Sequence, residues 1–140
     1  MTEAKSDSFP RRDADGRVVA LPDLLGVTLA GLVIGLAVLA VFDAGLSVVG
    51  AGRFGDANGW LAVILPVWLF AEEFRAWRIG PARIAVALVA AAVAIAAGLL
   101  GAGLTNGLPP LAAGGVGATV FSLVYALVWF HGVRWLAQRS

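Results

Sequence analysis

Residues 22–42 read PDLLGVTLAGLVIGLAVLAVF, an apolar stretch in which Asp23 is the only charged side chain. At 1.5 Å per residue, a helix of this length reaches about 30 Å, which matches the hydrocarbon core of a bilayer. Pro22 needs no N–H partner in the first turn of a helix, and the acidic Asp23 complements the helix dipole there. The stretch therefore predicts a membrane-spanning helix.

The composition of the whole chain agrees with this prediction. Of its 140 residues, 60% are hydrophobic and 14% are charged, whereas an average soluble domain carries about 25% charged residues. Too few polar groups are present to cover a water-soluble surface. A net charge of +1 and a single lysine provide no basic stripe, so nucleic acid is excluded as a partner. The chain contains no cysteine, so neither disulfides nor cysteine metal sites are expected.

Three further apolar segments follow the first, and the expected fold class is all-α, an integral membrane four-helix bundle over residues 22–140. We expect spans at about 22–42, 59–79, 82–104 and 116–136, after a hydrophilic tail at 1–21. The second span is irregular, because Trp60–Ala71 is its only uninterrupted apolar part and contains Pro66. Gly80 and Pro81 suit a helix end and the next helix start, which predicts a tight antiparallel hairpin of spans two and three.

The distribution of basic residues predicts the orientation. The tail, the turn near residues 75–83 and the C-terminal end carry nearly all the lysine and arginine, and the other two connections carry only Arg53. By the positive-inside rule, we expect a multi-pass membrane protein with both termini in the cytoplasm. The tail alternates in charge with little apolar pattern, so alone it should be disordered, and a partner is expected to hold it.

Two groups of residues are candidates for contact with another protein. Gly31 and Gly35 form a GxxxG pattern, which lets two helices approach closely, either within the bundle or with a partner. Acidic residues close to a membrane are costly unless paired, and helical spacing places Glu72 beside Arg75. This charge cluster is either satisfied within the chain or reaches a basic group on a partner. The candidate partner-binding residues are Gly31, Gly35, Arg11, Arg12, Glu72, Glu73, Arg75 and Arg78.

The sequence shows no recognisable set of catalytic, ion-binding or metal-binding residues. No acidic or basic residue lies in the middle of an expected span, where ion-coupled carriers hold the coupling ion. The sequence contains no nucleophile and base set, no phosphate-binding loop and only one histidine, His131. We therefore expect no catalytic residues, no cofactor and no metal, and the protein is not expected to be an enzyme.

The small multidrug-resistance transporters have four spans but keep a glutamate in the first, where residues 31–35 here read GLVIG. Rich in alanine, valine, glycine and arginine, the chain instead resembles the small four-span accessory subunits of actinobacterial membrane complexes, such as that of Mce-type lipid-import ABC transporters. The resemblance implies a non-catalytic subunit that stabilises or regulates a larger inner-membrane complex, a transporter or a respiratory assembly, among membrane lipids. The alternative is a homodimeric carrier or flippase for an uncharged or lipidic substrate, with a path lined by Ser122 and Tyr125.

Overall fold

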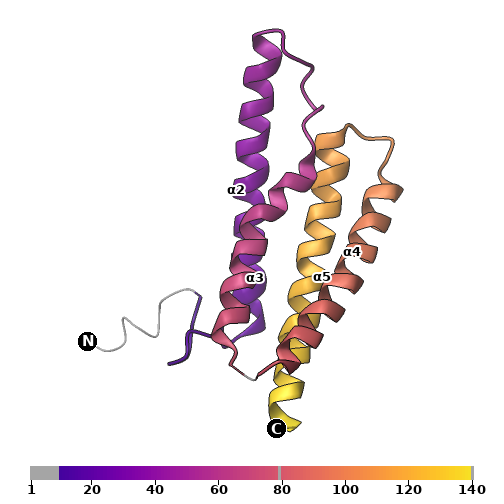
Figure 1. The fold of residues 1–140 in the computed structure, drawn as a ribbon. Coiled ribbons are helices and arrows are strands. Elements are labelled where there is room, and N and C mark those ends of the chain that lie inside the picture. The colour runs from indigo at the N-terminus through magenta and orange to yellow at the C-terminus, as the bar shows by residue number, and fades with distance from the viewer. Residues whose placement is uncertain (1–9, 79, 140) are drawn as a thin grey trace, which may run out of the picture.

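The computed structural model describes residues 10–78 and 80–139, and this part of the chain is helical except for its turns and an N-terminal segment, residues 10–20 (Figure 1). The elements are α2 (Leu21–Val48), the 3₁₀ helix η1 (Gly59–Val63), α3 (Ile64–Ala76), α4 (Ala82–Leu104) and α5 (Pro110–Arg139). Successive helices run in alternating directions. The N-terminal segment, the α3–α4 turn and the last turns of α5 lie at one end, the charged end; residues 49–58 and 105–109 lie toward the other, the loop end. The predicted all-α class is confirmed.

Three helices, α2, α4 and α5, are long and apolar enough to cross a membrane, which indicates a multi-pass membrane protein. The expected second span at 59–79 is divided instead into η1 and α3, which ends at Ala76. Pro66 explains the division, because a proline cannot donate the hydrogen bond that would continue an α-helix upstream. With 13 residues, α3 reaches only about 20 Å, so a four-span bundle is not confirmed.

Two helices extend beyond their expected ends. The helix that contains the expected first span at about 22–42 is longer than that span, because α2 continues to Val48 and encloses Asp43. Asp43 is buried, and its Oδ2 accepts a hydrogen bond from the Gly55 N–H at 2.6 Å, so the returning loop replaces water around the carboxylate. The helix that contains the expected last span also begins before residue 116. Pro110 is the first residue of α5, where its missing N–H costs nothing.

Helix α5 is the centre of the molecule, with α2 and α3 on one side and α4 on the other. The extensive contacts of α4 are all with α5, through the buried small residues Ala90, Ala94 and Gly98. A Cβ on Gly98 would lie 2.9 Å from the carbonyl oxygen of Gly117, so the two backbones approach closely. Among the described residues α3 and α4 have no extensive contacts with one another, so the expected antiparallel hairpin is wrong as a packed pair.

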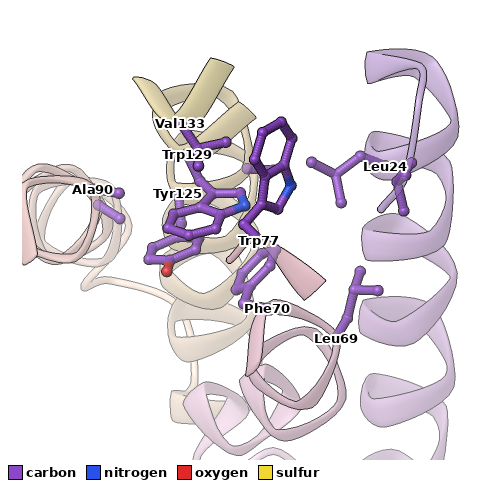
Figure 2. Close-up of a cluster of buried hydrophobic side chains, with 11 residues drawn as sticks. Leu24, Leu69, Phe70, Trp77, Ala90, Tyr125, Trp129 and Val133 are labelled. Carbon is purple, nitrogen blue, oxygen red and sulfur yellow. The ribbon is translucent and has the colours of Figure 1, made fainter. Parts of the chain in front are cut away.

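A ladder of aromatic rings fixes α3 against α5, and Figure 2 shows its members Phe70, Tyr125 and Trp129. On α5, Phe121, Tyr125 and Trp129 follow one another at a spacing of four residues, with ring centroids 6.3 Å apart at each step. From α3, Phe70 stacks on Tyr125 at 4.4 Å and Phe74 lies 6.0 Å from Trp129. These contacts set the register of α3 along α5 and bring the last turn of α3 to the charged end.

Candidate functional site

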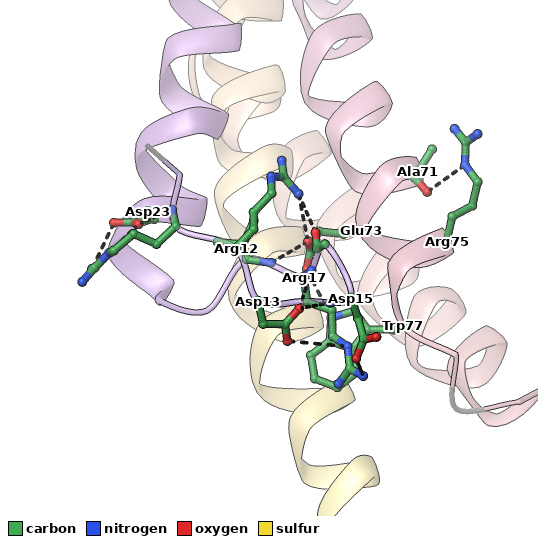
Figure 3. A network of polar contacts seen from close by, with 12 residues as sticks. Arg12, Asp13, Asp15, Arg17, Asp23, Ala71, Glu73, Arg75 and Trp77 are labelled. Carbon is green, nitrogen blue, oxygen red and sulfur yellow. Dashed lines mark hydrogen bonds and ion pairs between the residues drawn. The ribbon is translucent and has the colours of Figure 1, made fainter. Parts of the chain in front are cut away.

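The charged end is organised around Glu73, which lies in the last turn of α3 and is completely buried. Its Oε1 accepts a hydrogen bond from the Val18 N–H at 2.9 Å and lies 3.7 Å from the Arg12 Nη1 (Figure 3). Its Oε2 accepts a hydrogen bond from the Trp77 Nε1 at 3.2 Å. Both carboxylate oxygens are thus used by the chain itself, which offsets the cost of burying them.

The same group of residues ties the N-terminal segment to α5. The side chain of Val18 is completely buried, and its carbonyl oxygen accepts a hydrogen bond from the Arg134 Nη2. The Arg134 guanidinium lies 3.6 Å from the Phe130 ring centroid and 4.9 Å from that of Trp77. We call Arg12, Val18, Glu73, Trp77 and Arg134 the Glu73 cluster. It joins the N-terminal segment, α3 and α5 at one point.

The N-terminal segment is ordered by contacts within the chain. The Asp13 Oδ1 accepts hydrogen bonds from the backbone N–H groups of Asp15 and Arg17, and Gly16 closes the turn with a φ of +85°. Residues 10–20 are therefore held by α3 and α5, so their order does not require a partner. Residues 1–9 of the predicted tail lie outside the described residues.

Arg11 connects the N-terminal segment to the start of α2. Its Nε lies 3.0 Å from the Oδ2 of Asp23, and its backbone N–H donates to the same oxygen at 2.9 Å. The hydrogen bond and the charge of Asp23 raise the pKa of Arg11. Of the predicted partner-binding residues, Arg11 and Arg12 are therefore both engaged with carboxylates of their own chain.

The two adjacent glutamates point to different surroundings. Glu72 is exposed and accepts a hydrogen bond from the Arg75 Nη2 at 3.1 Å. Arg75 lies on the side of α3 away from the Glu73 cluster (Figure 3). Arg78 is exposed and pairs with no carboxylate among residues 10–78 and 80–139. The structure thus brings Glu73 together with Arg12, and leaves Glu72, Arg75 and Arg78 on the surface.

The GxxxG residues of α2 face η1 and α3. A Cβ on Gly31 would lie 3.3 Å from the Cβ of Leu65, and one on Gly35 would lie 3.2 Å from the Cα of Ala62. This is the packing within the bundle that the sequence left open as one of two alternatives. These two glycines therefore lie in an interface inside the molecule.

Sequence reasoning missed Val18, Trp77 and Arg134 as parts of the site. An apolar residue ahead of the first helix gives no signal that its amide will meet a carboxylate 55 positions later. In the described ranges, no three histidine, aspartate or glutamate side chains lie close enough to hold a metal ion. The Glu73 cluster is thus built from paired charges and stacked rings.

The surfaces outside the cluster are apolar. On α2, Val33, Val38 and Val41 are 62–74% exposed, and on α4 Leu88 and Leu100 are 65–66% exposed. In water such faces would drive aggregation, whereas in a bilayer they face lipid or another membrane protein. The molecule therefore presents apolar helix faces along its length and arginines at the charged end.

Comparisons with known proteins identified no relative of this chain. No family model matches this chain, and no curated protein or solved structure matches it significantly. The functional argument therefore rests on the geometry of the molecule.

Proposed function

We propose that this protein is a non-catalytic subunit of a larger integral membrane complex in the bacterial inner membrane, which it stabilises or regulates by lateral helix contacts. A transporter, such as an Mce-type lipid importer, and a respiratory assembly are the candidate complexes. The observation that carries the proposal is the one-sided packing of α4, whose extensive contacts are all with α5 while its other face is apolar and exposed. A partner that binds one conformation preferentially is sufficient for regulation.

The test is purification from native membranes in a mild detergent, combined with a photo-crosslinker at Leu88 on α4. We expect one stoichiometric heavier partner, crosslinked from Leu88. Val38 on α2 is similarly exposed and serves as the control position. A monodisperse chain without such a partner, in membranes from which it is freshly extracted, would overturn the proposal.

The finer membrane arrangement is part of the proposal. Gly59 packs against Leu111, and Trp77 stacks with Arg134, so η1 and α3 together accompany α5 over 23 residues, about 35 Å of helix. We infer that η1 and α3 complete a fourth crossing, with the arginine-rich charged end in the cytoplasm.

The chain has no cysteine, so single introduced cysteines report the topology directly. Arg53→Cys and Arg78→Cys should react with a membrane-impermeant maleimide from opposite sides of the membrane, with Arg78→Cys cytoplasmic. Labelling of both from the same side would show that η1 and α3 do not cross.

A homodimeric carrier or flippase for an uncharged or lipidic substrate is the second candidate. The Ser122 Oγ favours it, because this hydroxyl is completely buried and has no hydrogen-bond partner among the described residues. Reconstituted protein should then show saturable transport that Ser122→Ala and Tyr125→Phe abolish. Absence of transport in vesicles that contain the folded protein would remove this candidate.

A further inference from the structure

A groove of about 430 Å³ lies between α3 and α4, with α5 as its floor. It exists because α3 and α4 each pack on α5 and not on one another. Its walls are mostly apolar, from Val67, Phe70 and Phe74 on α3, Ala91 on α4 and Phe121 on α5. A hydrocarbon chain is the chemistry that such walls accept.

One polar group lies among these apolar walls. Tyr125 lines the groove and is 9% exposed, and its hydroxyl has no hydrogen-bond partner among residues 10–78 and 80–139. Figure 2 shows its oxygen pointing away from Leu24 on α2, toward the side where Ala90 of α4 lies. A hydroxyl without a hydrogen-bond partner is unfavourable among apolar walls. The hydroxyl is therefore positioned to donate to an acceptor on a molecule in the groove.

A cation lies farther along the same groove, toward the charged end. Arg75 lines it, and the Arg75 side chain is 65% exposed. Phe70, which stacks on Tyr125, precedes Arg75 by five residues, about 7.5 Å along α3. Among the described residues, Glu72 is the only carboxylate paired with Arg75. A second guanidinium, that of Arg83, lies 4.2 Å from the ring centroid of Phe74, which also lines the groove. The end of the groove is therefore net positive.

We propose that this groove binds one anionic glycerophospholipid. From the middle of the molecule to the charged end, the groove presents apolar walls, then a hydroxyl donor, then arginine. A glycerophospholipid presents an acyl chain, then ester carbonyl oxygens, then a phosphate in the same order. The acyl chain lies along Phe70 and Phe121, an ester carbonyl accepts from the Tyr125 hydroxyl, and the phosphate meets Arg75. This site belongs to the single chain and does not depend on the proposed partner complex.

The other side of α4 provides a control inside the molecule. A second groove between α4 and α5, of about 310 Å³, is lined by apolar residues such as Val86, Val89 and Leu136 and has no buried hydroxyl. Near it, Arg139 stacks on Trp135 with its guanidinium 4.6 Å from the ring centroid. This end therefore has a cation and an apolar groove but lacks the hydroxyl between them.

Native mass spectrometry of the full chain in detergent tests the proposal, with phosphatidylglycerol and the zwitterionic phosphatidylcholine added at equal concentration. We expect one bound phosphatidylglycerol per chain and a preference of about tenfold or more. Tyr125→Phe should weaken binding of both lipids several-fold, because the ester contact is common to them. Arg75→Gln should remove the preference, and Arg139→Gln should leave it unchanged. Excess inorganic phosphate should not displace the lipid, because the acyl chain supplies part of the affinity.

Ala91→Phe tests the groove without touching either polar contact, since it fills the space for the acyl chain. Thermal unfolding of each variant checks that it folds. Equal retention of the two lipids by the unaltered chain would overturn the proposal. Binding within twofold of the unaltered chain in Ala91→Phe or Tyr125→Phe would also overturn it, because the lipid would then lie elsewhere.

Discussion

Replacing Glu73 with alanine should release the N-terminal segment from α3. The substitution removes the two oxygens that accept the Val18 N–H at 2.9 Å and the Trp77 Nε1 at 3.2 Å. Both donors are then left without their acceptor at a buried position. The helix itself should persist, because alanine is a good helix former.

The magnitude follows from these two donors. A buried donor that loses its partner costs about 1–3 kcal/mol. The Arg12 contact adds little, because it is 3.7 Å long and its side chain is 37% exposed. We therefore expect local opening of residues 10–20 to become easier by about 3 kcal/mol, which is a factor of about 100 in the opening equilibrium.

Amide hydrogen exchange of the full chain in lipid nanodiscs measures this opening. The Val18 amide should exchange about 100-fold faster in Glu73→Ala than in the unaltered chain. Glu72→Ala is the matched control. Glu72 forms an exposed ion pair with Arg75 on the same helix, worth about 0.3–0.5 kcal/mol, so this substitution should leave exchange at Val18 nearly unchanged. Exchange at Val18 that stays the same in both variants would refute the reasoning about the Glu73 cluster.

Three further predictions concern the backbone contacts. Gly59→Ala should lower the free energy of unfolding by about 3 kcal/mol or more, because the added Cβ would clash with the carbonyl oxygen of Leu111. Gly45→Ala is the control, because a Cβ there would have no atom within 4 Å and should be tolerated. Thermal unfolding measures both variants. Arg134→Gln should cost about 1–3 kcal/mol, read as a lower Tm, because it alters the donor to the Val18 carbonyl and removes the ring stacking. Asp43→Ala should speed amide exchange in residues 49–58, because the Gly55 N–H loses its acceptor; unchanged exchange there would contradict this role.

Much of the helical fold follows from the sequence because the apolar runs of α2, α4 and α5 leave few other structures possible in a membrane. The ends were harder to predict for local reasons. Asp43 reads as the end of a span, yet a loop amide satisfies it inside the helix. Pro110 reads as a helix breaker, yet it is the first residue of α5. In both cases the hydrogen bonding of one residue, and not its hydropathy, decides whether it belongs to the helix.

The site was less accessible to sequence reasoning. Helical spacing correctly places Glu72 beside Arg75, and the structure shows that pair at 3.1 Å. The same spacing does not reveal that Glu73 turns inward, because its donor, Val18, comes from a segment outside the helices. Such long-range pairs depend on how α3 lies against α5, which the aromatic ladder fixes and the sequence pattern does not display.

The placement of charge restricts how this protein can recognise another. The three buried carboxylates of the described residues, Asp23, Asp43 and Glu73, all accept hydrogen bonds within the chain. An ion pair with a partner at any of them would first have to break a buried contact, which is costly. In the proposed complex, recognition inside the membrane would then depend on the shapes of the apolar faces, where close packing of small residues provides the attraction. Helix α4 has extensive contacts only with α5, so its opposite face is not packed against the chain. Packing by a partner would therefore bury the most additional surface on this face.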